Sequence, residues 1–94
     1  MKSLTDLREE LDGVDREIVR LFEKRMNIAC DVAWYKMANG LPVLDRSREE
    51  QVLQSRAALT EDPAWGPSVR QLYEAIMALS RDAQTRLMEQ RKEE

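Results

Sequence analysis

The chain has 94 residues and a mass of 11.0 kDa, enough for one small domain with a single core. Charged residues make up 35% and hydrophobic residues 43%, with three glycines and three prolines, so we expect a folded, mainly helical chain. There is no histidine and only one cysteine, Cys30. These counts exclude histidine-based triads, histidine-ligated zinc, a metal cage of cysteine thiolates and an internal disulfide.

Charge and hydropathy also limit the partners. Fifteen basic and eighteen acidic residues give a formal charge of -3, and no basic run follows one face, so nucleic acid is not an expected partner. No window approaches the ~18 apolar residues of a membrane span, and the opening residues lack a signal-peptide core. We expect a cytoplasmic chain without membrane contact, whose arginines can still converge on a small anion.

The first predicted helix covers about Leu4 to Ala38. Its apolar residues recur at alternating spacings of three and four. They are Leu4, Leu7, Leu11, Val14, Ile18, Leu21, Ile28, Val32 and Tyr35. Ser3 and Asp6 have capping-box spacing at the start of this helix, and an Asn-Gly-Leu-Pro segment ends it.

Two shorter helices are predicted to follow. One begins after Asp45, a good N-cap, and ends near Leu59, ahead of an Asp-Pro break. The other begins at Ser68, which has capping-box spacing with Gln71, and its charged end over 89–94 is expected to fray. No strand pattern is present. We therefore predict a single all-α domain over residues 1–94, with one long, one short and one medium helix.

The length of the first helix predicts a dimer. About 35 helical residues span roughly 52 Å, whereas a compact chain of this size has a radius of gyration of about 12 Å. The helix therefore extends beyond its own short partners, while its apolar stripe continues. We expect a second copy to cover that stripe in an intertwined homodimer.

Polar residues interrupt the apolar pattern of the first helix. Arg25 occupies a heptad position that elsewhere holds leucine, isoleucine or valine. It forms an internal salt bridge, for instance to Asp45 or Glu49, or fixes the register of the helices, or binds the carboxylate of a ligand through its planar guanidinium. Lys36, eleven residues later, points within about 20° of Arg25 on an ideal helix. Both side chains can therefore address one pocket.

Arg8 lies too far from Arg25 to share a pocket within one chain. The separation of seventeen residues corresponds to about 25 Å along the helix axis. Arg8 either pairs with Asp12 at the helix surface or reaches the pocket of another subunit.

The two later helices carry polar groups beside their apolar positions. Asp45, Arg48 and Glu49 share one face, although Asp45 can simply cap the helix and the other two can form a surface ion pair. Ser80 and Gln84 lie in or beside the apolar seam of the third helix, where the serine can allow close packing and the glutamine can be solvated. Together with the cations, these groups suggest a pocket for a small molecule with several carboxylates and a hydroxyl.

The whole set resembles the all-helical chorismate mutase family, over essentially the entire chain. The segment Leu7–Asp15 is similar to the family's opening Leu-Arg-x-x-[Leu/Ile]-Asp-x-x-Asp, and Arg25 and Lys36 match its arginine and lysine. Residues 42–49 resemble its Pro-Val-x-Asp-x-x-Arg-Glu element, and the last helix carries its Ser-x-x-x-Gln pair. The resemblance implies intertwined dimers that convert chorismate to prephenate in the shikimate pathway of aromatic amino-acid biosynthesis.

The resemblance also implies a role for each polar residue. Lys36 and Gln84 would donate hydrogen bonds to the ether oxygen of chorismate, and with Arg25 they form the implied catalytic set. The implied substrate-binding set is Arg8 supplied in trans, Arg25, Lys36, Asp45, Arg48, Glu49, Ser80 and Gln84. Its arginines and the serine would hold the two carboxylates, and its two acidic residues would orient the ring hydroxyl. The rearrangement is intramolecular and needs no cofactor.

Two other functions remain open at this point. One is an isochorismate-pyruvate lyase on the same scaffold, and the other is a non-catalytic helical dimer with a regulatory role. Arg81 stands beside Ser80 where the family has an apolar residue, and the connection before the third helix is one residue short. Trp34 and Trp65 receive no assignment.

Overall fold

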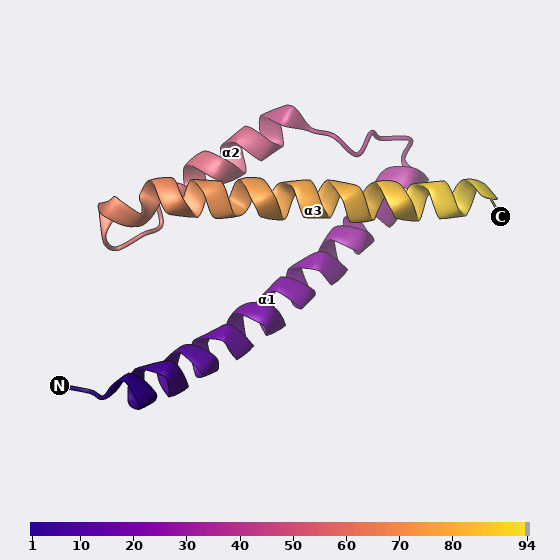
Figure 1. The fold of residues 1–94 in the computed structure, drawn as a ribbon. Coiled ribbons are helices and arrows are strands. Elements are labelled where there is room, and N and C mark those ends of the chain that lie inside the picture. Colours follow the sequence, from indigo (N-terminus) through magenta and orange to yellow (C-terminus); the bar gives the residue numbers. More distant parts are fainter. Residues whose placement is uncertain (94) are drawn as a thin grey trace.

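The computed structural model describes residues 1–93 and contains three α-helices (Figure 1). Helix α1 is Leu4–Ala38, α2 is Arg46–Ala57 and α3 is Gly66–Glu93, with a 3-10 turn, η1, at Pro63–Trp65. These residues include no strand and no helix long and apolar enough to cross a membrane. The prediction of an all-α fold with one long, one short and one medium helix is confirmed.

The ends of α1 lie where the sequence places them. The Ser3 hydroxyl accepts a hydrogen bond from the backbone N–H of Asp6 at 3.1 Å, which satisfies one of the free donors of the first turn. At the other end Gly40 has a φ of +65°, a left-handed conformation that ends a helix at little cost for glycine.

Helix α2 begins after the predicted cap and ends slightly early. The Asp45 side chain accepts a hydrogen bond from the backbone N–H of Arg48 at 3.0 Å, so its assignment as N-cap is confirmed. The helix ends at Ala57, two residues before Leu59.

The predicted start of α3 at Ser68 is wrong. Asp62 caps the 3-10 turn through its contact with the backbone N–H of Ala64, and this turn leads directly into α3 at Gly66. Ser68 therefore lies inside the first turn and caps nothing. A Cβ on Gly66 would lie 3.3 Å from the Ala57 carbonyl oxygen, so a glycine lets the start of α3 approach the end of α2 closely.

At its other end α3 continues to Glu93, and Glu94 lies outside the described residues. The expected fraying over 89–94 stays a prediction. The guanidinium of Arg91 lies 5.1 Å from the centre of the Trp34 ring. This cation–π contact joins the last turns of α3 to α1 and gives Trp34 a packing role.

Helix α3 packs against both other helices in an elongated molecule. Helix α2 runs back along α3, and the C-terminal half of α1 crosses α3, while the N-terminal half of α1 extends away (Figure 1). The radius of gyration is 16.9 Å, against about 12 Å for a compact chain of this length. The buried apolar positions are small, namely Ala29, Ala33 and Val52.

The apolar stripe of α1 is left uncovered by its own chain. Eight of its residues are 41% to 61% exposed: Leu4, Leu7, Leu11, Val14, Ile18, Leu21, Ile28 and Val32. So long an exposed apolar stripe is unusual for a monomer and is typical of an interaction surface.

An ion pair between α2 and α3 gives the first testable prediction. The Arg70 guanidinium lies 3.0 Å and 3.1 Å from the two carboxylate oxygens of Glu50, and these hydrogen bonds lower the pKa of Glu50. A lowered folded-state pKa stabilises the fold above the unfolded-state pKa, and this stability is lost as the pH falls through the folded pKa. We expect Arg70→Met to lower the unfolding midpoint slightly at pH 7. The difference in midpoint between this variant and the unaltered chain should close below the ordinary glutamate pKa of 4.5. Thermal melts across this pH range measure the difference. A difference in midpoint that stayed constant with pH would contradict the role of this ion pair.

Candidate active site

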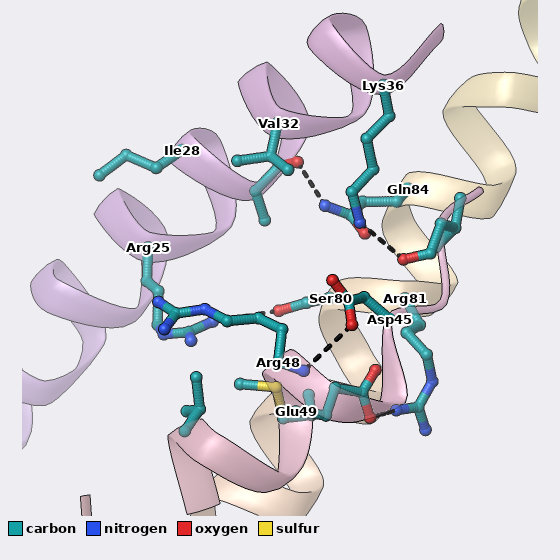
Figure 2. A pocket seen from close by; sticks show the side chains of 14 residues that line it. Arg25, Ile28, Val32, Lys36, Asp45, Arg48, Glu49, Ser80, Arg81 and Gln84 are labelled. Atoms are coloured by element: carbon teal, nitrogen blue, oxygen red, sulfur yellow. Dashed lines mark hydrogen bonds and ion pairs between the residues drawn. The ribbon is translucent and has the colours of Figure 1, made fainter. Parts of the chain in front are cut away.

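A cavity of about 300 Å³ lies between the C-terminal half of α1, the start of α2 and the middle of α3 (Figure 2). Its polar lining residues are Arg25, Lys36, Asp45, Arg48, Glu49, Ser80, Arg81 and Gln84, and its apolar ones are Ile28, Ala29, Val32, Val43, Val52 and Met77. Seven of the eight predicted site residues therefore surround one cavity, although they come from three separate helices. The exception is Arg8.

Lys36 is fixed in the lining of the cavity by the loop after α1. Its Nζ donates a hydrogen bond to the Val43 carbonyl oxygen at 2.7 Å, and the side chain is half-buried. The loop can fold back in this way because Gly40 adopts a positive φ and the Leu41 N–H bonds to the Lys36 carbonyl at 2.8 Å. An ammonium group has three N–H donors, so two are left for a ligand.

Gln84 is held against the backbone of α1. Its Nε2 donates to the Ala29 carbonyl oxygen at 2.7 Å, and the residue is 7% exposed, so the solvated alternative is wrong. Ala29 and Ala33 are both buried and allow α3 to approach α1 closely. The amide nitrogen carries a second N–H, which is available to a group in the cavity.

Arg25 and Ser80 meet across the α1–α3 contact. Arg25 Nη1 donates to Ser80 Oγ at 3.4 Å, and the guanidinium carbon lies 5.7 Å from the centre of the Tyr73 ring. Arg25 is half-buried and forms no ion pair with a described residue, so the predicted alternative of an internal salt bridge is not found. An arginine held by a hydroxyl and an aromatic ring keeps donors free for an anion.

The N-cap and the first turn of α2 supply three ionisable groups. Asp45 uses one carboxylate oxygen for the helix cap, and Arg48 Nη1 donates to Gln51 Oε1 at 2.5 Å. Glu49 does not pair with Arg48, contrary to the surface ion pair considered from the sequence. It pairs instead with Arg81 on α3.

Arg81 is the lining residue to which sequence reasoning gave no role. A charged residue directly after Ser80, where an apolar residue was expected, was the feature of the sequence that could have marked Arg81 as part of the site. With it, four cationic and two acidic side chains line the cavity, namely Arg25, Lys36, Arg48 and Arg81 against Asp45 and Glu49. The difference, four minus two, leaves an excess of two positive charges, which suits a dianionic ligand.

Arg8 lies on the exposed, extended part of α1 and does not line the cavity of its own chain. Among the described residues it forms no ion pair, so the alternative of a contact with Asp12 is also not found. Because α1 is one continuous helix from Leu4 to Ala38, Arg8 and Arg25 are separated along its axis as predicted.

The chain belongs to the chorismate mutase type II family, whose model matches residues 7–85. Its fold is similar to a solved form of chorismate mutase from Thermus thermophilus, with a TM-score of 0.85 and 32% identity over 90% of this chain and 97% of that one. A conserved hypothetical protein from Pyrococcus furiosus is also similar, with a TM-score of 0.71 and 34% identity over 88% of this chain and 99% of that one. The resemblance noted in the sequence is thus confirmed at the level of the family.

Curated relatives match parts of the chain. The T-protein of Haemophilus influenzae is 43% identical over 56 residues, which are 60% of this chain and 15% of that protein. The chorismate mutase of Methanocaldococcus jannaschii is 33% identical over 52 residues, covering 55% of this chain and 52% of that protein. The matched stretch thus spans only a fraction of the length of these relatives.

Proposed function

We propose that the chain catalyses the rearrangement of chorismate to prephenate. The observation that carries the proposal is one cavity that gathers four cations, two carboxylates and the buried Gln84 amide. This lining complements a substrate with two carboxylates, a ring hydroxyl and an ether oxygen. Chorismate has these groups, and the family and the Thermus thermophilus neighbour carry the name of this reaction.

Each group has a distinct task in the proposed reaction. Arg25, with Ser80 and Arg48, binds carboxylates, while Asp45 and Glu49 accept hydrogen bonds from the hydroxyl. Lys36 and Gln84 each keep an N–H free after their bonds to backbone carbonyls, and these donors meet the negative charge that develops on the ether oxygen. The proposed catalytic groups are therefore Lys36, Gln84 and Arg25.

The energies required are within reach of binding alone. Holding the substrate in its chair-like diaxial conformer is a proximity effect with a ceiling of about 7 to 11 kcal/mol. Each well-placed donor to the transition state adds roughly 3 to 4 kcal/mol. A modest enzymatic acceleration needs about 8 kcal/mol, so the chain's own residues suffice without a nucleophile or proton shuttle.

The proposal includes an intertwined homodimer in which Arg8 of each chain enters the other chain's cavity. The exposed stripe of α1 supports it, because burial of these half-exposed side chains is the main stabilisation available to the extended half of the helix. We further propose that residues 1–94 form a single functional domain, which works in the cytoplasm. A monomer in scattering experiments that rearranged chorismate at full rate would contradict the dimeric site.

Product analysis tests the reaction directly. We expect the protein to convert chorismate to prephenate, measured by loss of chorismate absorbance and by identification of the product. Incubation with isochorismate is the matched control, since release of pyruvate from isochorismate alone would indicate a lyase instead. An absence of turnover with both compounds would favour the non-catalytic alternative.

A further inference from the structure

Arg81 forms the one ion pair that crosses the lining of the cavity within the described residues. Its Nη1 contacts Glu49 Oε1, which joins the middle of α3 to the first turn of α2. The Glu49 side chain is 22% exposed and the Arg81 side chain 38% exposed, so the pair is better shielded than the other described ion pairs. Shielding makes such a pair stronger and more directional than one in open solvent.

The two partners have different relations to the cavity. Figure 2 shows the Arg81 guanidinium on the side of the Glu49 carboxylate that faces away from Arg25. The contact occupies Oε1 of Glu49, whereas Oε2 has no hydrogen-bond partner among the described residues. A carboxylate oxygen accepts hydrogen bonds, so Oε2 is the part of Glu49 that can bind a ligand hydroxyl.

We propose that Arg81 is a positioning residue, which fixes the Glu49 carboxylate so that its second oxygen accepts a hydrogen bond from the substrate hydroxyl. This inference rests on the proposed function. A glutamate on the first turn of a helix has three rotatable side-chain bonds, and the remaining cations of the cavity, Arg25, Lys36 and Arg48, compete for its negative charge. The pair with Arg81 holds the carboxylate away from them and leaves them free for the substrate carboxylates.

The experiment is a double-mutant cycle on chorismate turnover, with Arg81→Met, Glu49→Gln and the double variant. We expect Arg81→Met to lower kcat/KM about tenfold, because a misplaced binding group loses the reactive geometry. In the Glu49→Gln background the same change should alter kcat/KM by less than about twofold, since Arg81 then has no carboxylate to position. Arg81→Lys keeps a cation that can reach Glu49 and should recover part of the loss.

Arg86→Met is the matched control. It removes another arginine–carboxylate pair from α3, the exposed contact of Arg86 with Asp82, whose carboxylate raises the pKa of the Arg86 guanidinium. We expect it to leave kcat/KM within about twofold of the unaltered chain. Circular dichroism and unfolding midpoints of all variants show whether the helices remain formed.

The outcomes separate this proposal from the proposed function. If the unaltered chain turns over chorismate but Arg81→Met lowers activity equally in both backgrounds, Arg81 acts on the substrate directly and the positioning role is wrong. If Arg81→Met has no effect, or Arg81→Lys is as impaired as the methionine variant in a folded protein, the proposal is also overturned. If the unaltered chain neither binds nor converts chorismate, the proposed function itself fails.

Discussion

Replacing Lys36 with alanine is expected to lower kcat for chorismate at least about a hundredfold. Lys36 lines the cavity, and its Nζ is held at 2.7 Å from the Val43 carbonyl oxygen, so its remaining N–H groups are oriented before the substrate arrives. Preoriented donors stabilise developing charge without reorganising during the reaction. Loss of the side chain leaves the helices in place, which circular dichroism can check, and progress curves at saturating chorismate measure the effect.

An Arg8→Ala chain is expected to be similarly inactive, and mixing it with the Lys36→Ala chain should restore activity. Each chain retains the residue that the other lacks, so a mixed dimer contains one intact site and one site with both changes. Random exchange of equal amounts makes half of the dimers mixed, and the recovered rate should approach about a quarter of that of the unaltered protein.

The recovery depends on where Arg8 acts. Arg8 is exposed and does not line the cavity of its own chain. If subunit exchange is verified by mass spectrometry and the rate does not recover, Arg8 acts within its own chain or not at all. Mixing two Lys36→Ala preparations through the same exchange procedure is the control and should yield no gain.

Changing Gln84 to glutamate is expected to make the reaction depend on acid. Gln84 is 7% exposed and its amide donates to the Ala29 carbonyl, so an ionised carboxylate at this position would lose solvation and face a carbonyl oxygen. Burial raises the pKa of a carboxyl group, and only its protonated form can donate a hydrogen bond. Activity should therefore be high below this raised pKa and fall as the pH rises through it.

At pH 8 we expect Gln84→Glu to be slower than the unaltered chain by about a hundredfold, with most of the loss recovered near pH 5. Gln84→Ala lacks any donor and should stay slow at every pH. A flat pH–rate profile for a folded glutamate variant would remove Gln84 from its role at the ether oxygen.

Several parts of the site were predictable because they follow from local rules. The spacing of Arg25 and Lys36 on one helix fixes their common direction, and Asp45 before a helical stretch predicts a cap. Both features are present in the structure. The start of α3 was missed because Asp62 and Pro63 form a short 3-10 turn that leads into the helix, and the capping-box spacing of Ser68 with Gln71 is as acceptable locally as the true start.

The three helices, the excess length of the first one and the residue types that a dicarboxylate requires could all be inferred from the order of the residues. These properties depend on periodicity, capping and helix rise, which act over a few residues. The pairing of Glu49 with Arg81 rather than with Arg25 or Arg48, and the bond of Gln84 to the Ala29 carbonyl, became visible once the helices were placed in space. Such choices depend on the distances between helices, and those are set by how α1, α2 and α3 pack.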